Sequence, residues 1–265
     1  MHVYVSADIE GITGIANWEE ADKAHPDYAW FKDRMNREVA AACEGALLGG
    51  ATALTVKDAH GSGRNLVPDR LPRPARLIRG WSGHPYSMVQ ELDETCQALA
   101  FVGYHSPSTS GGHPLSHTMT GKYARIELDG ALLSEFRLNA TTAATHGVPC
   151  VFLSGDERLC AEARAYDPRI VTVASGHGVG HSTVGLHPSI VLERIQEGMA
   201  QAVRGAAEVD VEPPTGPFTL QIRFRVHHDA YRASHYPGAV AVSDDTVRLV
   251  ATDWIDVLRA ITFWK

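Results

Sequence analysis

The chain has 265 residues, 44% hydrophobic and 21% charged, which suits one large globular domain or a main domain with a smaller one. Its formal charge of −7, with no cluster of Lys or Arg, argues against nucleic acid as a partner. No apolar run reaches the roughly 18 residues of a membrane span, so no membrane partner is expected.

The first predicted strand covers residues 3–7 and ends at two carboxylates. Its sequence, Val-Tyr-Val-Ser-Ala, is typical of a buried strand. Asp8 and Glu10 follow at once, and side chains two residues apart on an extended chain point the same way. Two buried carboxylates at one strand end are unfavourable without a cation or another partner. Either one alone would more often cap a helix or face solvent.

A long helix and a second strand come next. Apolar residues at helical spacing predict a helix over residues 28–50, and residues 53–56 read as a buried strand. A strand, a helix and a strand in series predict a βαβ unit with parallel strands. Asp58 and His60 follow the second strand, and one of them could bind a metal while the other orients it. The Gly/Ser-rich residues 61–65 predict a loop suited to closing over a site.

A third apolar run, residues 98–104, ends at His105. The Gly/Ser-rich loop that follows, residues 106–120, carries His113 and His117, and such loops often carry function. Histidine titrates near neutral pH, so either one could act as a general acid or base. A short strand is also predicted over residues 75–78, ahead of this region.

The dipeptide Asp129-Gly130 predicts a tight hairpin over residues 124–133, and a helix is expected from Ser134 to about residue 145. Two acidic residues here could join a metal site. Glu127 alternates outward in the hairpin, whereas Glu135 occupies the first helical turn, where the helix dipole favours an anion. The pattern alone leaves both open.

The rest of the chain predicts strands over 148–153 and 170–173, a helix to residue 165, a Gly/His loop over 175–187 and a helix over 188–206. Two strands and a terminal helix, 218–226, 244–251 and 254–264, follow a Pro-rich boundary at 212–217. We therefore expect an α/β catalytic domain with a mainly parallel sheet flanked by helices, residues 1–211. A smaller α+β subdomain, residues 217–265, is expected to serve assembly.

Cysteine usage and the N-terminal residues bear on the compartment. Four cysteines lack any Cys-x-x-Cys spacing and lie in apolar patterns, so they are expected to be buried free thiols: Cys43, Cys96, Cys150 and Cys160. The first residues are strand-like and carry Asp8, which does not fit a signal peptide. We therefore expect a cytoplasmic protein.

Three strand ends thus carry potential metal ligands: Asp8, Glu10, Asp58, His60 and His105. In open α/β sheets, ligands bind beyond the carboxyl ends of the strands, so these side chains are expected to converge. Carboxylate and imidazole groups together are the ligands of a hydrolytic zinc site. The pattern therefore predicts a metal-dependent hydrolase.

Five motifs, in this order, carry a family resemblance. They are Asp-Ile-Glu-Gly-Ile-Thr-Gly at 8–14, Lys-Asp-Ala-His-Gly at 57–61, Gly-Tyr-His at 103–105, Ser-His-Thr at 116–118 and Ser-Glu-Phe-Arg-Leu-Asn-Ala at 134–140. The chain resembles the zinc-dependent D-aminopeptidases associated with dipeptide transport. The resemblance covers most of residues 1–200.

The resemblance implies a site with two zinc ions. The implied metal ligands are Asp8, Glu10, His60, His105 and Glu135. His117 matches the proposed catalytic histidine, while Asp58, Asn139 and His113 would support the ligands or contact the substrate. Asp8 would bridge the metals, and a metal-activated water would attack the peptide bond.

The resemblance also implies a substrate and an assembly. The substrates would be short peptides with an N-terminal D-residue, and the assembly would be a self-compartmentalising double ring of ten subunits. The family commonly has a Lys and then an Arg ahead of the late helix. This chain instead reads Ala-Ser-Gly-His-Gly-Val-Gly-His at 174–181, so substrate recognition there departs from the family pattern.

Two alternative functions remain open from the residues. The same metals could serve an amidohydrolase or a phosphoesterase, for which Lys57, Arg64 and Lys122 are the nearby cations. The chain could also be a non-catalytic, ring-forming protein that keeps a metal for stability.

Overall fold

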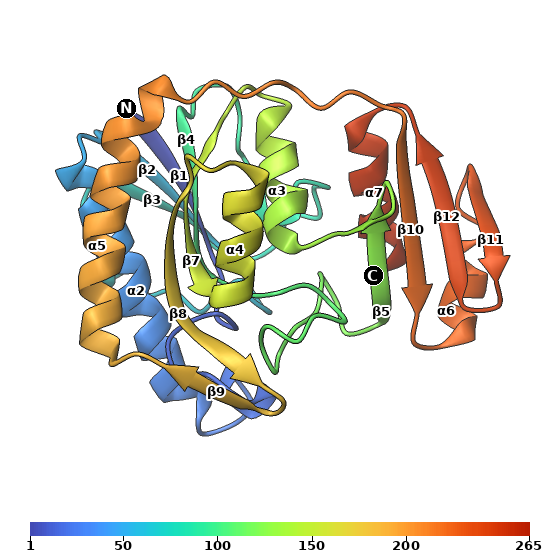
Figure 1. Cartoon of the computed structure of the whole chain (residues 1–265), viewed down its shortest axis with the longest axis horizontal. Helices are drawn as coiled ribbons and strands as arrows, with labels where there is room; N and C mark the ends of the chain where they lie inside the picture. The colour runs from blue at the N-terminus through green and yellow to red at the C-terminus, as the bar shows by residue number, and fades with distance from the viewer.

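Seven strands form one sheet in a computed structural model that describes residues 1–265, in the order β3-β2-β1-β4-β7-β8-β9 (Figure 1). They are β1 (His2–Ala7), β2 (Ala53–Asp58), β3 (Ala75–Ile78), β4 (Ala98–Tyr104), β7 (Cys150–Asp156), β8 (Val171–Val179) and β9 (Ser182–Gly185). All neighbours pair in parallel except β8 and β9. The predicted mainly parallel α/β sheet is confirmed.

Helices cover both faces of this sheet (Figure 1). One face carries α2 (Tyr28–Leu48) and α5 (Pro188–Gly205), and the other carries α3 (Glu135–Ala144) and α4 (Glu157–Tyr166). Successive side chains of the central strand β1 point to opposite faces of the sheet, which explains why each face has its own hydrophobic cluster. Val3 and Val5 join the hydrophobic cluster of α2 and α5, whereas Tyr4 joins the cluster of α3 and α4. Strand β1 is therefore buried on both sides.

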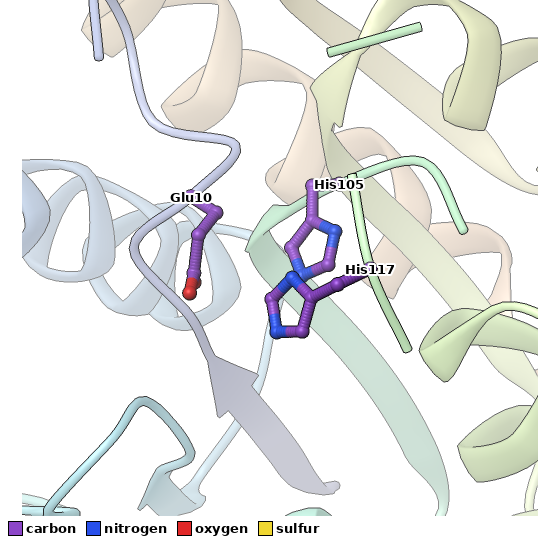
Figure 2. A group of neighbouring side chains, drawn as sticks. All are labelled: Glu10, His105 and His117. Carbon is purple, nitrogen blue, oxygen red and sulfur yellow. The ribbon is translucent and has the colours of Figure 1, made fainter. Parts of the chain in front are cut away.

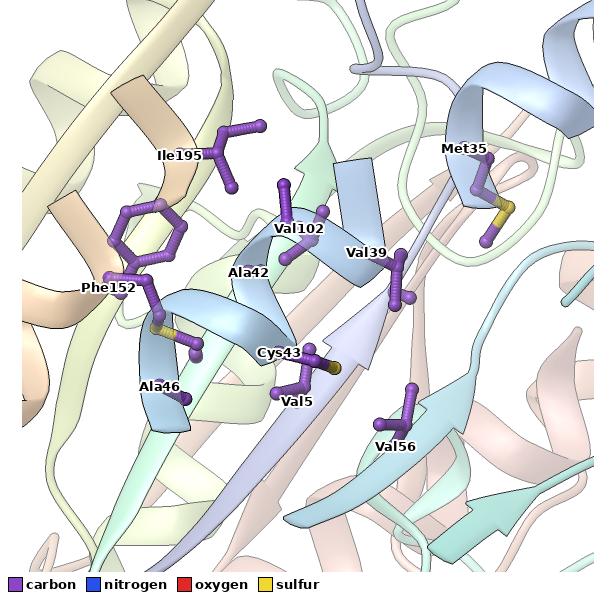
Figure 3. Close-up of a cluster of buried hydrophobic side chains, with 14 of the residues drawn as sticks. Val5, Met35, Val39, Ala42, Cys43, Ala46, Val56, Val102, Phe152 and Ile195 are labelled. Atoms are coloured by element: carbon purple, nitrogen blue, oxygen red, sulfur yellow. The ribbon is translucent and has the colours of Figure 1, made fainter. Parts of the chain in front are cut away.

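The core beneath α2 fixes this helix across the sheet. Met35, Val39 and Ala42 of α2 are fully buried and pack with Val5 and Val56 of the strands (Figure 3). Full burial of one such Val or Met side chain contributes roughly 1.5–3 kcal/mol. This packing holds the β1-α2-β2 unit, and with it the ends of both strands, in one rigid arrangement.

A second sheet is antiparallel, with strand order β11-β12-β10-β5-β6. Its strands are β5 (Tyr123–Leu128), β6 (Ala131–Leu132), β10 (Phe218–Phe224), β11 (Ala239–Ser243) and β12 (Thr246–Ala251), with α6 (His227–Ala233) and α7 (Trp254–Trp264) packed on it. The predicted tight hairpin is confirmed, since Asp129 and Gly130 have φ of 52° and 80°.

That hairpin, β5-β6, lies inside the range 1–211 expected for the catalytic domain, but it belongs to the second sheet. Strand β5 pairs with β10 over Leu128 to Tyr123, a contact between segments about 90 residues apart in the chain. The division of the chain into domains 1–211 and 217–265 therefore stays a prediction.

The prediction of a loop over 175–187 is wrong, because β8 continues to Val179 and turns into β9. Glycine allows this pairing: a Cβ on Gly176 would lie 2.5 Å from the carbonyl oxygen of Val184. A Gly-rich sequence is typical of a loop, but glycine also occurs in strands whose backbones must approach each other closely. Strand β11 was also not predicted.

The remaining elements are short. They are α1 (Trp18–Ala21) and the 3-10 turns Pro68–Arg70, Ser87–Val89 and Ala206–Glu208. The four cysteines are buried free thiols, as predicted. No helix of the protein has the length and apolarity that crossing a bilayer requires.

Candidate metal centre

The candidate ligands gather where the strand order of the large sheet reverses. From β1 the chain proceeds to β2 on one side and later returns to β4 on the other, which leaves a crevice at the carboxyl ends of the strands. The register brings these ends level, because Ala7 pairs with both Asp58 and Val102. Asp8, His60 and His105 therefore emerge beside one another, as the strand-end pattern predicts.

Two glycines permit the close contact of the β1 and β4 ends. A Cβ on Gly11 would lie 1.8 Å from the carbonyl oxygen of Tyr104, and one on Gly103 would lie 2.3 Å from that of Asp8. Gly103 also has φ of +72°, where side chains are strained. The backbone N–H of Gly11 donates to the carbonyl oxygen of Gly103 at 2.8 Å. Any larger residue at either position would push the ligands apart.

The first group of potential ligands is Asp8, Glu10 and His60. His60 Nε2 donates to the carbonyl oxygen of Ala21 at 2.9 Å, so in the neutral ring Nδ1 keeps its lone pair. That Nδ1 lies 3.0 Å from Glu10 Oε2 and 3.4 Å from Asp8 Oδ1. A lone pair and two carboxylates repel one another unless the ring is protonated or a cation lies between them.

The second group is Asp8, His105 and Glu135. His105 Nδ1 donates to the carbonyl oxygen of Ser106 at 3.0 Å, which directs Nε2 toward the carboxylates. Nε2 lies 3.5 Å from Glu135 Oε2 and 3.7 Å from Asp8 Oδ2. Both His105 Nε2 and Glu135 Oε2 are buried without a hydrogen-bond partner. Unpartnered buried polar atoms that face each other at this spacing fit a shared metal ion.

Glu135, rather than Glu127, belongs to this group. Ser134 caps α3 by accepting from the N–H of Arg137 at 3.0 Å, which places Glu135 in the first turn, facing the crevice. Its Oε1 accepts from the N–H of Met119 at 2.6 Å. Glu127 instead forms an ion pair with Arg125 at 2.7 Å on the second sheet. Chain topology thus decides between two residues that the pattern left open.

His117 lies beside both groups, and its ring stacks on that of His105 with centroids 4.4 Å apart and planes at 10° (Figure 2). With Glu10 and His105 it forms a third potential ligand group. Its Nδ1 donates to the carbonyl oxygen of Leu115 at 2.9 Å, so Nε2 is free to accept a proton. Nε2 lies 3.8 Å from Glu135 Oε1, on the cavity side of the cluster.

Burial and mutual charge shift the pKa values in the cluster. Burial and the charge of Glu10 raise the pKa of Asp8 well above its usual value. Burial lowers the pKa of His105, but Glu135, Glu10 and Asp8 outweigh it and raise that pKa to about 10. Burial and the negative charges of the cluster thus favour protons on Asp8 and His105, and metal dications would supply the same positive charge.

Asp58 supports the loop that carries His60. Its carboxylate accepts from the backbone N–H groups of Asn65 and Leu66 at 2.5 and 2.7 Å, and from Asn65 Nδ2 at 2.7 Å. Asn65 Nδ2 also donates to the carbonyl oxygen of His60 at 2.8 Å. Asp58 therefore acts on His60 through the backbone, without touching its ring.

Asn139 and His113 lie outside the cavity beside the cluster. Asn139 Nδ2 donates to the carbonyl oxygen of Glu135 at 2.8 Å, one helical turn back. His113 Nδ1 accepts from the N–H of Leu115 at 3.2 Å, and burial together with the charge of His105 lowers its pKa to about 4. Neither residue therefore faces this cavity directly.

Asp156 is a structural residue that the sequence analysis missed. It caps α4 by accepting from the N–H of Leu159 at 2.9 Å. The same carboxylate accepts from the N–H and hydroxyl of Ser106 at 2.5 and 2.6 Å. The loop after His105 is thus anchored at its first residue. The position of Asp156 at the end of β7, another strand of the parallel sheet, is the signal that could have revealed it.

The model of the M55 peptidase family, described as D-aminopeptidase, matches residues 1–263. The chain belongs to the M55 family. The resemblance drawn from the five motifs is confirmed.

The M55 chain is similar to a curated protein sequence and to a solved structure. It is 30% identical over 264 residues to a D-aminopeptidase of Bacillus subtilis strain 168, covering 98% of this chain and 95% of the relative. It also matches the solved structure of the Zn-dependent D-aminopeptidase DppA from Bacillus subtilis, described as a self-compartmentalizing protease. That match has a TM-score of 0.92 and 28% identity, and covers 100% of this chain and 96% of the other.

A cavity of about 550 Å³ opens onto the cluster of this M55 peptidase. Trp18 and Trp81 are among its walls, and Lys265 lines it from the end of α7. None of residues 174–181 lines it. The segment where the chain departs from the family pattern therefore lies away from this cavity, and sequence reasoning gave no signal for Trp81 or Lys265.

A buried carboxyl behind the cluster predicts a pH dependence of stability. Glu38 accepts from the N–H of Thr13 at 2.9 Å, and burial raises its pKa from 4.5 to about 7. The folded state therefore holds a proton that the unfolded chain releases above pH 4.5. The free energy of unfolding should fall as the pH rises through this window, by roughly 2–3 kcal/mol between pH 5 and pH 8.

The side chain in Glu38→Gln cannot ionise. The free energy of unfolding of this variant should therefore not show the decrease that Glu38 causes between pH 5 and pH 8. Urea unfolding of both proteins at pH 5, 6, 7 and 8 measures the difference. Parallel pH profiles for the two proteins would show that Glu38 is already ionised in the folded state at pH 5.

Proposed function

We propose that the chain is a binuclear zinc aminopeptidase that hydrolyses short peptides with an N-terminal D-residue through a metal-activated water. The observation that carries the metal centre is the pair of ligand groups that share Asp8. One oxygen of Asp8 faces His60 and the other faces His105, which suits a bridging carboxylate. Membership of the M55 family and the Zn-dependent relative support the metal and the reaction.

One zinc ion would be held by Asp8, Glu10 and His60, and the other by Asp8, His105 and Glu135. When bound, the ions supply Lewis acidity, which polarises the peptide carbonyl and lowers the pKa of a water toward about 7. The backbone carbonyls bonded to the far nitrogens of His60 and His105 keep both rings oriented.

His117 would move the proton. Its Nδ1–H is engaged by Leu115, so Nε2 can accept the proton of the attacking water and return it to the leaving amine. Trp18 packs edge-on against this ring at 5.0 Å between centroids and shields one side of it from water. The substrate amine would lie at the carboxylate end of the cavity.

Phosphate chemistry is less well supported. Lys57 is the cation closest to the strand ends, yet its ammonium donates to the carbonyl oxygens of Asp58 and Gly80 at 2.6 and 2.8 Å. Neither Arg64 nor Lys122 lines the cavity. None of the three cations considered from the sequence is therefore placed to clamp a phosphoryl group.

We also propose assembly of several copies into a closed ring structure, with ten subunits as the expected number. The self-compartmentalizing relative supports assembly. Edge strand β11 exposes Val240 and Val242, and its neighbour β12 exposes Val250, so the predicted subdomain 217–265 offers an apolar edge. The proposed compartment is the cytoplasm, with which four free thiols agree.

Metal removal tests the proposed reaction. Purified protein should hydrolyse D-alanyl-D-alanine faster than L-alanyl-L-alanine, and chelation should reduce both rates to background because the metals activate the water. Added zinc should restore the activity, and elemental analysis should find about two ions per chain. Activity that survives complete, verified metal removal would contradict the metal mechanism. A panel of phosphodiesters provides the control for the alternative reaction.

A further inference from the structure

The cavity beside the cluster has charges of opposite sign at different places on its wall. Asp8, Glu10 and Glu135 lie on the side of the strand ends. Lys265 is the only Lys or Arg among the 19 lining residues. It comes from the end of α7, which packs on the second sheet, so the basic residue and the acidic residues belong to different elements of the fold.

Packing of the last turn of α7 fixes where Lys265 leaves the helix. Trp264 is 1% exposed and belongs to the core of the second sheet, together with Ile261. The backbone N–H of Lys265 donates to the carbonyl oxygen of Ile261 at 3.3 Å. The side chain thus starts from an anchored position and is directed into the cavity.

The ammonium of Lys265 has no hydrogen bond and no ion pair within the chain. It lies 5.9 Å from the ring centroid of Trp81, a weak contact for a cation. Burial lowers the pKa of Lys265, and the charge of Glu135 opposes this. An ammonium without a partner on the wall of the cavity is available to an anion that enters it.

Trp81 forms a rigid wall next to this ammonium. Its indole N–H donates to the carbonyl oxygen of Gly61 at 2.8 Å, and the ammonium of Lys57 lies 4.0 Å from its ring centroid. Because Lys57 is bonded to two carbonyl oxygens, it holds the indole and is not free for a ligand. Among the Lys and Arg side chains, Lys265 is therefore the one that lines the cavity with its charge free for a ligand.

We propose that Lys265 binds the free C-terminal carboxylate of the peptide substrate. A short zwitterionic peptide would place its amine near the acidic side chains and its carboxylate at Lys265, with the scissile bond between them. The inference rests on the proposed aminopeptidase function and narrows its substrates to peptides short enough to reach both ends, foremost dipeptides. Lys265 is a binding residue for a remote group, not a participant in bond cleavage.

Matched substrates and variants test this role. D-Alanyl-D-alanine and D-alanyl-D-alaninamide share the scissile bond and differ in the terminal charge. Lys265→Met, of similar length without the charge, should lower kcat/KM about 10- to 100-fold for the free dipeptide, as expected for loss of a charge-assisted hydrogen bond. The main change should be in KM, and the amide should change by less than about threefold.

Two controls separate charge from fold. Lys265→Arg keeps the charge and should retain most of the preference for the free dipeptide. Lys122→Met removes one exposed lysine outside the cavity and should change neither substrate. Circular dichroism and zinc content should match the parent protein for every variant.

Equal losses on both substrates in Lys265→Met, or no loss on either, would overturn the inference. If the zinc-loaded parent protein hydrolyses neither substrate, the proposed function fails on its own. Calorimetric titration of parent and Lys265→Met with the two compounds would then still decide the inference, because preferential binding of the free dipeptide must depend on Lys265.

Discussion

Glu135→Gln is expected to lower kcat/KM by at least about 100-fold. Substitution of residues that only support metal ligands already lowers metal affinity or activity about 10- to 100-fold. The amide nitrogen cannot replace the carboxylate oxygen that faces His105 Nε2 at 3.5 Å. Elemental analysis should show less zinc per chain in the variant, and the loss of activity should be only partly reversed by excess zinc.

Glu127→Gln is the matched control for that experiment. The same substitution is made eight residues earlier, on strand β5, where the carboxylate contacts Arg125 and Gln221 and no ligand group. Activity and zinc content should both stay at the level of the parent protein. Full zinc content and full activity in Glu135→Gln would remove Glu135 from the proposed metal centre.

The second large effect is expected at His117. His117→Ala should lower kcat by about 10²- to 10⁴-fold, the usual contribution of a general acid or base, while the zinc content stays near that of the parent protein. The proposed ligand groups of the two ions do not need His117, whose nearest carboxylate oxygen lies 3.8 Å from Nε2. Retained metal with lost turnover is the pattern that separates proton transfer from metal binding.

His181→Ala removes an exposed histidine in the turn between β8 and β9 and serves as its control. It should change neither kcat nor zinc content. Loss of zinc in His117→Ala would instead assign His117 to metal binding, as the third potential group with Glu10 and His105 allows. Undiminished turnover would assign the proton transfer to another residue.

The parallel sheet and its ligand-bearing edge were predictable because they depend on local patterns. Apolar runs that end in polar residues identify β1, β2 and β4, and a long helix between the first two implies parallel pairing. Once the strands are parallel, their carboxyl ends must share one edge. The convergence of Asp8, His60 and His105 follows from that rule without any knowledge of side-chain contacts.

Other features depended on contacts that local patterns do not encode. Glycines in β8 resemble a loop, but they meet the backbones of β9 and of Gly112, so a strand forms there. The hairpin β5-β6 has clear turn chemistry, yet nothing local reveals that it pairs with β10. Strand β11 is short and lacks a strong period.

By itself, the sequence determined the α/β class, the strand ends that carry the potential ligands, and the M55 family to which the chain belongs. Only the tertiary structure separated Glu135 from Glu127, showed which nitrogen of each histidine faces the carboxylates, and brought Lys265 into the same cavity. The reason is the distance along the chain over which each interaction acts. Hydrophobic periodicity and turn chemistry act over a few residues, whereas Lys265 and Glu135 are far apart in the chain and line one cavity only in the folded structure.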